Sequence, residues 1–156
     1  MLRKLYIEPT TKCNLNCKMC FRHTWFDEPF CDLSLEDFRH VIATMPSSAE
    51  TIFFGGMGEP LFHKDILEMI SLAADTGADV ELLTNGTLLT RHQEMLLAAP
   101  ALHKVNISLH AYEANDLETP FSQYLDGCFC FGQAARGEKL VVYRLWNQGG
   151  ADARNG

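Results

Sequence analysis

Residues 51–83, TIFFGGMGEPLFHKDILEMISLAADTGADVELL, decide the fold class. The β-branched and aromatic run at residues 51–54 reads as a strand, and two glycines end it. Apolar residues within 63–76 repeat at helical spacing, and Gly77 is a typical helix stop. Residues 80–83 form a second short apolar run. Two strands joined by a helical crossover pair in parallel, so the stretch predicts a β–α–β unit.

The same alternation continues on both sides of this unit. Further strands are predicted at residues 5–7, 105–109 and 140–146, and further helices at 35–45, 90–99 and 121–135. Ser34 and Thr90 are expected to cap two of these helices, and Pro46 and Pro100 to end them. Four β–α repeats and a fifth strand predict a parallel α/β sheet. Right-handed crossovers would make it an open doubly wound sheet or a barrel.

Length and composition describe an ordinary globular domain. The chain has 156 residues and a net charge of −7, which disfavours a general nucleic-acid or anionic-membrane surface. It lacks an apolar run of the roughly 20 residues that a membrane-spanning helix needs. The N-terminus has basic residues without the apolar stretch of a secretory signal, so a cytoplasmic location is expected. Residues 148–156 are small and polar and are predicted to be a flexible tail.

Three of the six cysteines fall in a C-x3-C-x2-C run directly after the first strand: Cys13, Cys17 and Cys20. Thiolates are soft ligands that suit an iron–sulfur cluster or zinc. Three thiolates leave one position of a cubane cluster open, whereas a closed structural zinc site needs a fourth ligand. His23 or Cys31 could supply that ligand, so both metals remain open. Cys128 and Cys130 are expected to be buried free thiols.

Four more signals follow predicted strands. They are Gly55–Pro60 after the second strand, Thr84–Thr87 after the third, Ser108–Ala111 after the fourth, and Arg144 within the fifth. Active sites of α/β barrels and open sheets lie at the carboxyl ends of the strands. Ser108 and His110 are expected to alternate on one face of a strand. Each signal also has a simpler interpretation: a glycine turn, an Asn-Gly turn, a core histidine or a structural salt bridge.

In their order, the C-x3-C-x2-C run and the strand-end motifs resemble the radical S-adenosylmethionine enzymes. The resemblance implies a [4Fe–4S] cluster held by Cys13, Cys17 and Cys20, with S-adenosylmethionine bound to the fourth iron through its amino and carboxylate groups. Electron transfer from a protein such as ferredoxin or flavodoxin would cleave the cofactor and yield a 5′-deoxyadenosyl radical. The expected fold is then a partial TIM-like barrel.

The resemblance also implies a set of cofactor contacts. Met57, Gly58 and Glu59 align with the family's GGEP motif and would hold the methionyl amino group of S-adenosylmethionine. Ser108 and His110, at the end of the fourth predicted strand, would contact its ribose or carboxylate. Arg144 is a candidate partner for the cofactor carboxylate. Two residues depart from the family pattern: Met19 stands where an aromatic residue is usual, and His110 where many members have Asp. The expected cofactor-binding residues are Met19, Gly56, Met57, Gly58, Glu59, Asn85, Ser108, His110 and Arg144.

Residues 3–97 are further similar to the radical enzymes that mature tungsten-cofactor oxidoreductases, while the sequence from Val105 onward is more like another subgroup. This predicts peptide or protein modification, or cofactor maturation, with the substrate left open. Relatives have six β–α units, so residues 1–147 are expected to be an incomplete core that is truncated after the fifth strand. The alternatives are a non-catalytic zinc or iron–sulfur module and an inactive truncated remnant.

Overall fold

The structure is a computed structural model that describes residues 3–24 and 29–145. The expected flexible tail and the end of the predicted fifth strand, Trp146, lie outside these residues. The strands are β1 (Lys4–Ile7), β2 (Thr51–Phe54), β3 (Asp79–Thr84), β4 (Leu102–Ser108) and β5 (Leu140–Arg144). The α-helices are α1 (Leu35–Thr44), α2 (Ile66–Ala74), α3 (Leu89–Ala98) and α4 (Phe121–Ala134). Three short 3-10 turns are η1 (Phe21–Thr24), η2 (Pro60–Phe62) and η3 (Leu109–Ala111).

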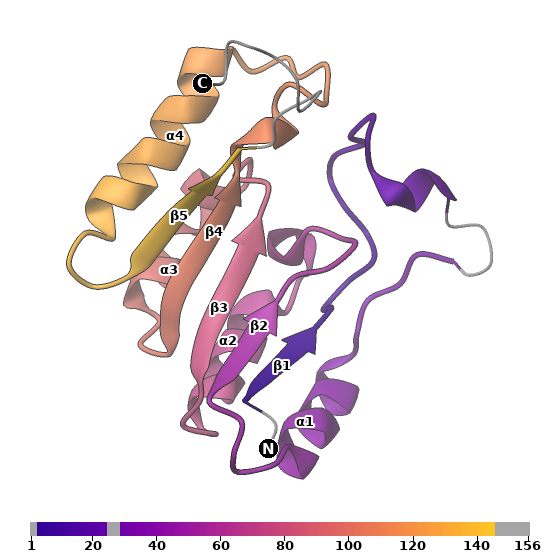
Figure 1. Ribbon diagram of the computed structural model, residues 1–156, viewed down its shortest axis with the longest axis vertical. Helices are drawn as coiled ribbons and strands as arrows, with labels where there is room; N and C mark the ends of the chain where they lie inside the picture. The colour runs from indigo at the N-terminus through magenta and orange to yellow at the C-terminus, as the bar shows by residue number, and fades with distance from the viewer. Residues whose placement is uncertain (1–2, 25–28, 146–156) are drawn as a thin grey trace.

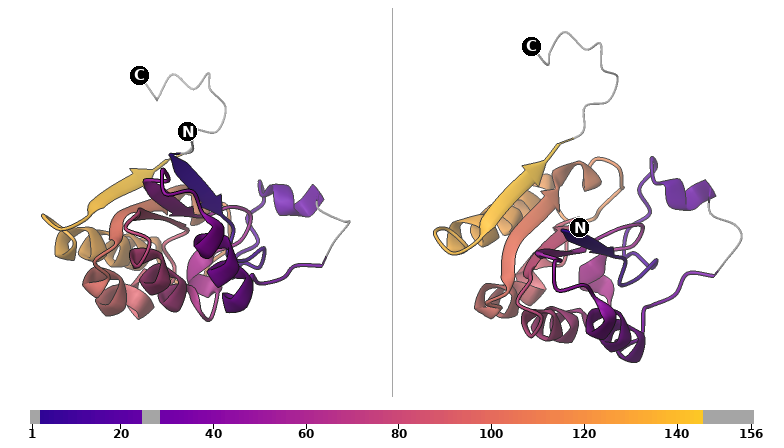
Figure 2. Two further views of the ribbon diagram at one scale, coloured as in Figure 1. Left: turned by 90° about the horizontal axis from the view of Figure 1, so that it is seen from below. Right: turned by 60° about the horizontal axis from the view of Figure 1, so that its bottom comes forward.

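The strands form one parallel sheet in the order β1-β2-β3-β4-β5. Every strand pairs with the next one in the chain, and the order never reverses. Right-handed crossovers therefore place each connecting helix on the same face of the sheet. Figures 1 and 2 show α1 to α4 together on one face of the sheet. A doubly wound sheet carries helices on both faces, so that alternative is excluded for the described residues. The prediction of a partial barrel of parallel strands is confirmed.

The hydrophobic core lies between the sheet and its helices. Alternate strand residues point toward the helices, as the period of two requires. Ile52 and Phe54 of β2 are fully buried, and Phe54 packs against Phe38 of α1 with ring centroids 5.7 Å apart. Burial of each such side chain contributes about 1.5–3 kcal/mol. This layer fixes the strand register and therefore the positions of the strand ends.

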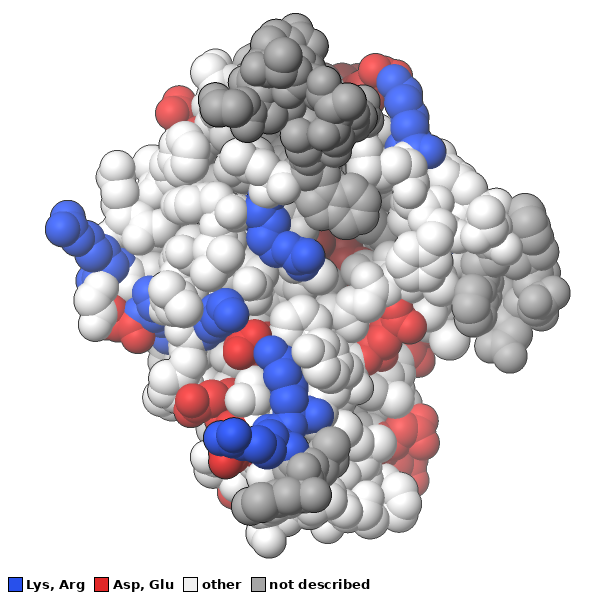
Figure 3. All heavy atoms as spheres, in the orientation of Figure 1, with Lys and Arg blue, Asp and Glu red and all other residues white. Residues whose placement is uncertain are grey.

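The opposite face of the sheet carries charged side chains. Glu81 of β3 has an Oε2 atom 2.7 Å from Lys4 Nζ and 3.7 Å from Lys104 Nζ. On the face shown in Figure 3, basic and acidic side chains are interspersed. In the described residues, no helix is long and apolar enough to cross a membrane.

Several element boundaries differ from the predictions. Ser34 is the N-cap of α1 as expected, and its hydroxyl accepts a hydrogen bond of 3.1 Å from the Asp37 N–H. The predicted Thr90 cap is wrong, because α3 begins at Leu89 after Leu88 and makes no side-chain cap bond. The start of α2 is Ile66 and not residue 63, because the turn η2 takes up the preceding residues and His63 ends it.

Two predictions about the second half of the chain also need correction. β4 runs from Leu102 to Ser108, so His110 lies in η3 and does not alternate with Ser108 along a strand. Cys128 is buried as expected, but Cys130 is exposed. The two cysteines sit two residues apart on α4, and positions with that spacing face different sides of a helix.

Candidate active site

An open cavity of about 220 Å³ lies at the carboxyl ends of the strands. All twelve residues predicted for the cluster and cofactor site line it, and their individual roles stay predictions. Three are the cysteines of the C-x3-C-x2-C run, and the rest come from the same loop and from the ends of β2 to β5. Four lining residues were not predicted: Phe21, Leu83, Thr84 and Ala111.

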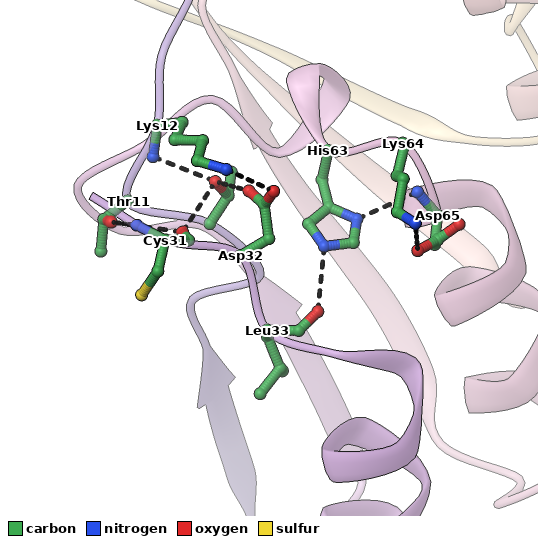
Figure 4. A network of polar contacts seen from close by, with 9 residues as sticks. Thr11, Lys12, Cys31, Asp32, Leu33, His63, Lys64 and Asp65 are labelled. Atoms are coloured by element: carbon green, nitrogen blue, oxygen red, sulfur yellow. Dashed lines mark hydrogen bonds and ion pairs between the residues drawn. The ribbon is translucent and has the colours of Figure 1, made fainter. Parts of the chain in front are cut away.

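The cysteine loop is closed at its base by a short antiparallel pairing that the sequence did not reveal. Thr10 forms a β-bridge with Asp32, and the Thr11 N–H donates to the Cys31 carbonyl over 3.0 Å. The Asp32 carboxylate accepts hydrogen bonds from the Thr10 hydroxyl at 2.6 Å and from Lys12 Nζ at 2.8 Å (Figure 4). We call this arrangement, formed by residues 9–12 and 31–33, the clasp.

His63, to which the sequence assigned no role, joins the clasp to η2. It is only 3% exposed. Its Nε2 lies 3.0 Å from the Leu33 carbonyl oxygen, and its Nδ1 accepts from the Asp65 N–H at 3.0 Å (Figure 4). A neutral imidazole with its proton on Nε2 satisfies both contacts. His63 therefore ties the clasp to the segment that follows η2.

The glycine-rich segment after β2 lies directly on the cysteine loop. A Cβ atom at Gly58 would overlap with the carbonyl oxygens of Thr10 and Lys12, so only glycine allows this approach. The Glu59 N–H donates to the Lys12 carbonyl at 2.9 Å. Nearby, Gly56 has a φ of 144°, and the Glu8 side chain occupies the space that a Cβ there would need.

Glu8 extends this contact to the first strand. Its Oε1 accepts a hydrogen bond from the Met57 N–H. The residue follows β1 directly, so it links the end of the first strand to the segment that follows the second. Sequence reasoning missed Glu8, because a single glutamate after a short strand carries no spacing signal of its own.

Glu59 is buried, with 2% of its surface exposed, and connects β2 to β3. Its Oε1 accepts from the Leu61 N–H at 3.0 Å and from the Thr84 hydroxyl at 2.8 Å. Its Oε2 accepts from the Asn85 N–H at 2.6 Å. Burial raises the pKa of Glu59 to about 7, although these hydrogen bonds act in the opposite direction.

Asn85 continues the connection from β3 to the cysteine loop. Its Nδ2 donates to Asn14 Oδ1 at 3.0 Å and lies 3.9 Å from Cys13 Sγ. Its Oδ1 accepts from both the backbone N–H and the hydroxyl of Thr87. The Thr-Asn-Gly-Thr turn thus holds the loop that carries the cysteines.

The ends of β4 and β5 supply polar groups with free bonding capacity. In the described part of the chain, the Ser108 hydroxyl makes no hydrogen bond and the Arg144 guanidinium makes no ion pair. Burial lowers the pKa of His110; a hydrogen bond to the Arg144 backbone opposes this shift, and the guanidinium charge adds to it. This side of the cavity therefore presents the Ser108 hydroxyl, the His110 imidazole and the Arg144 guanidinium.

Two of the three cysteine sulfurs lie beside hydrogen-bond donors. Cys17 Sγ lies 3.1 Å from Asn115 Nδ2, and Cys13 Sγ accepts from the Leu15 N–H at 3.4 Å. The buried Nε of Arg22 has no partner among the described residues. Burial raises the pKa of the Cys13 thiol, and the Arg22 charge acts against that shift. The N–H groups beside these sulfurs and the Arg22 Nε can donate to an anionic group. They therefore suit an iron–sulfur group bound by thiolates.

The described residues of the cavity include side chains of the types that bind metals, but they are not arranged as a metal site. Within the described residues, no three His, Cys, Asp or Glu side chains are arranged to hold a metal ion. All three cysteines are free. The two expected fourth zinc ligands have other surroundings: His23 Nε2 lies 3.0 Å from the Cys17 carbonyl oxygen, and the Cys31 sulfur points away from the clasp (Figure 4). The donor set fits an iron–sulfur group better than a closed zinc site.

Comparison with known families identifies this arrangement. The model of the radical SAM superfamily matches residues 7–126. The chain belongs to the radical SAM superfamily. The cysteine run and the motifs after β2, β3 and β4 lie within the matched region, whereas Arg144 lies beyond its end. The family resemblance predicted from the sequence is confirmed.

The chain is similar to a tungsten-containing aldehyde ferredoxin oxidoreductase cofactor-modifying protein of Pyrococcus furiosus. It is 34% identical over 146 residues, which are 92% of this chain and 39% of the relative. An S-adenosylmethionine-dependent nucleotide dehydratase of Selenomonas ruminantium is 37% identical over 91 residues, 57% of this chain and 32% of the relative. The similarity to tungsten-cofactor maturases is confirmed. The chain spans about two fifths or less of the length of these relatives.

Several solved structures share the fold. BtrN in complex with AdoMet and 2-DOIA has a TM-score of 0.72 at 17% identity, covering 92% of this chain and 57% of that one. Streptococcus suis SuiB bound to the precursor peptide SuiA has a TM-score of 0.69 at 18% identity, covering 90% of this chain and 32% of that one. At such identities the likeness concerns the fold alone.

Proposed function

We propose that this chain forms the core of an enzyme that binds a [4Fe–4S] cluster through Cys13, Cys17 and Cys20 and reductively cleaves S-adenosylmethionine. One observation carries the proposal. The three cysteines and the ends of β2 to β5 line a single cavity at the edge of the sheet where α/β enzymes hold their ligands. Membership in the radical SAM superfamily supports the same chemistry.

When bound, a cluster held by Cys13, Cys17 and Cys20 would supply the single electron, taken from a ferredoxin- or flavodoxin-type donor, that reductive cleavage of S-adenosylmethionine requires. The chain contributes binding, orientation and electrostatics. The Arg144 guanidinium, which has no ion pair in the described residues, suits the carboxylate of the cofactor. Ser108 and His110 lie beside it in the cavity and suit the carboxylate or ribose.

The segment from Gly56 to Glu59 suits the amino group of the cofactor. A carboxylate offers about four acceptor sites. Glu59 uses three of them, for Leu61, Thr84 and Asn85, which leaves one for an ammonium group. Met19 lines the same cavity, where its backbone would meet the adenine edge. Asn85 completes the wall and, through Asn14, keeps the cysteine loop in place.

The substrate of this core is proposed as a peptide, a protein or a cofactor precursor. The tungsten cofactor-modifying relative supports cofactor maturation. A PqqA peptide cyclase of Bradyrhizobium diazoefficiens, 31% identical over 108 residues, supports a peptide, as does the SuiB structure with its precursor peptide.

Replacing one cluster ligand tests the proposal. We expect wild-type chain, reconstituted anaerobically with iron and sulfide and reduced with dithionite, to convert S-adenosylmethionine to methionine and 5′-deoxyadenosine. Cys17→Ala should lose the cluster and this activity, because two thiolates cannot hold it. Cys130→Ala is the matched control, because Cys130 is exposed on α4 and does not line the cavity. Iron content, the visible spectrum and product masses are measured together.

Two results would contradict the proposed function. The first is a Cys17→Ala variant with the iron content and cleavage rate of the Cys130→Ala control. The second is a wild-type chain that takes up zinc in preference to iron and sulfide under the same conditions, which would favour a structural metal module.

A further inference from the structure

We propose that Asn115 is a positioning residue that raises the reduction potential of the cluster by donating an N–H···S hydrogen bond to Cys17. The inference rests on the proposed function, because it concerns the cluster named there. The Asn115 Nδ2 atom lies 3.1 Å from Cys17 Sγ. No motif or spacing in the sequence pointed to this contact, which joins residues 98 positions apart.

The orientation of the Asn115 amide is fixed by its backbone partners. Its Oδ1 accepts from the Asn16 N–H at 3.0 Å, and its Nδ2 donates to the Ala111 carbonyl at 2.7 Å. An N–H can only donate and a carbonyl can only accept, so a flipped amide would place like groups against each other on both sides. The remaining N–H of Nδ2 is therefore the group that faces the sulfur.

The segment around Asn115 is held along the cysteine loop. The Lys18 N–H donates to the Ala114 carbonyl at 3.0 Å, one residue before Asn115. Ala111 and Ala114 are both buried, and Asn115 itself is partly buried. The amide thus bridges the loop after β4 and the backbone between two cluster ligands. This rigid support is what a group needs to act on a neighbouring metal site.

The direction of the effect follows from charge. Reduction adds one electron from the external donor to the cluster and makes its thiolate ligands more electron-rich. A hydrogen-bond donor to a ligand sulfur stabilises the reduced state more than the oxidised state, which raises the potential. Asn115 would therefore make reduction of the cluster easier for a physiological donor.

Asn115→Asp tests this role with little change in shape. The aspartate keeps an oxygen for the Asn16 N–H, and its second carboxylate oxygen replaces the nitrogen that donates to Cys17 and to the Ala111 carbonyl. We expect the equilibrium constant for one-electron reduction to fall about tenfold, which is about 59 mV toward more negative potential. The measurement is a redox titration of the reconstituted chain, followed by the electron paramagnetic resonance of the reduced cluster.

Asn16→Asp is the matched control. It adds the same charge next to Cys17, but on an exposed side chain that makes no hydrogen bond in the described residues. A general effect of added charge would lower the potential of both variants. A shift in Asn115→Asp no larger than that in Asn16→Asp overturns the inference.

A second variant at Asn115 keeps the inference testable when Asn115→Asp binds too little cluster for a redox titration. Asn115→Leu removes the donor without adding charge, and its potential should also fall below that of the wild type. An unchanged potential in this variant, or loss of the cluster from both Asn115 variants while Asn16→Asp stays loaded, overturns the tuning role. A wild-type chain that binds no cluster refutes the proposed function, not the role of Asn115. Reconstitution of the wild type, which precedes any measurement on the variants, distinguishes the two.

Discussion

At the scale of single residues, Glu59 joins three parts of the site. Its carboxylate accepts hydrogen bonds from the Leu61 N–H of η2, from the Thr84 hydroxyl and from the Asn85 N–H. Its own N–H donates to the Lys12 carbonyl in the cysteine loop. A buried donor left without a partner costs about 1–3 kcal/mol. The buried carboxylate therefore satisfies groups that would otherwise destabilise the cavity wall.

The raised pKa of Glu59 predicts a pH-dependent stability. Its folded-state pKa is about 7, against an ordinary value of 4.5. The folded state thus binds more protons between these values, so the contribution of Glu59 is complete below about pH 4.5 and is lost as pH rises through about 7. The loss amounts to roughly 3 kcal/mol at 1.36 kcal/mol per pKa unit. Urea unfolding of the apoprotein at several pH values measures it.

Glu59→Gln should remove this pH dependence. The difference in unfolding free energy between wild type and Glu59→Gln is expected to change across pH 4.5 to 7. The control is Glu94→Gln, which alters an exposed carboxylate on α3. A difference that stays constant with pH would show that Glu59 is already ionised in the acid range.

At the scale of elements, the clasp decides how firmly the cysteine loop is closed. Partial burial works against ionisation of Asp32, but hydrogen bonds from Lys12 and Thr10 outweigh it and lower the pKa of this carboxyl. Its contribution is thus present above the ordinary value of 3.8 and is lost only as pH falls through the lower folded value. The clasp should remain closed over the neutral range.

Asp32→Ala should open the clasp. The change removes the acceptor for the Thr10 hydroxyl and for Lys12 Nζ. We expect faster hydrogen exchange at the N–H groups of Thr11 and Leu33, which cross the pairing. Asp116→Ala serves as the comparison, because its side chain is 92% exposed. Equal exchange in the two variants would mean that the backbone bridge closes the loop without Asp32.

Sequence periodicity predicted the elements well, because a strand or helix buried on one side carries its own pattern. Boundaries were less predictable. Thr90 has the chemistry of a cap, yet the turn that begins at Gly86 already starts α3 at Leu89. The site residues that belong to motifs were predictable, because each motif follows a strand and the carboxyl ends of parallel strands lie at one edge of the sheet. Glu8, Asn115 and the clasp were not, because they depend on contacts between distant segments.

At the scale of the whole molecule, the cavity joins the loop near the N-terminus to the last described strand. A ligand that fills it should therefore stabilise the entire fold. We expect S-adenosylmethionine at 100 times its dissociation constant to raise the unfolding free energy of the cluster-loaded chain by about 2.7 kcal/mol. Arg144→Met should need more ligand for the same gain, whereas Arg136→Met, exposed outside the cavity, should not. Anaerobic denaturant titrations measure the shift.

The sequential strand order also has a consequence for biosynthesis. Each strand pairs with the one made just before it, so a growing chain can extend the sheet one strand at a time. The cysteine loop emerges early, but its anchors at Glu59, Asn85 and Asn115 are synthesised later. Until then the three thiols lack the groups that hold and shield them. Insertion of the proposed cluster is therefore expected late, after β4 and the segment beyond it have left the ribosome.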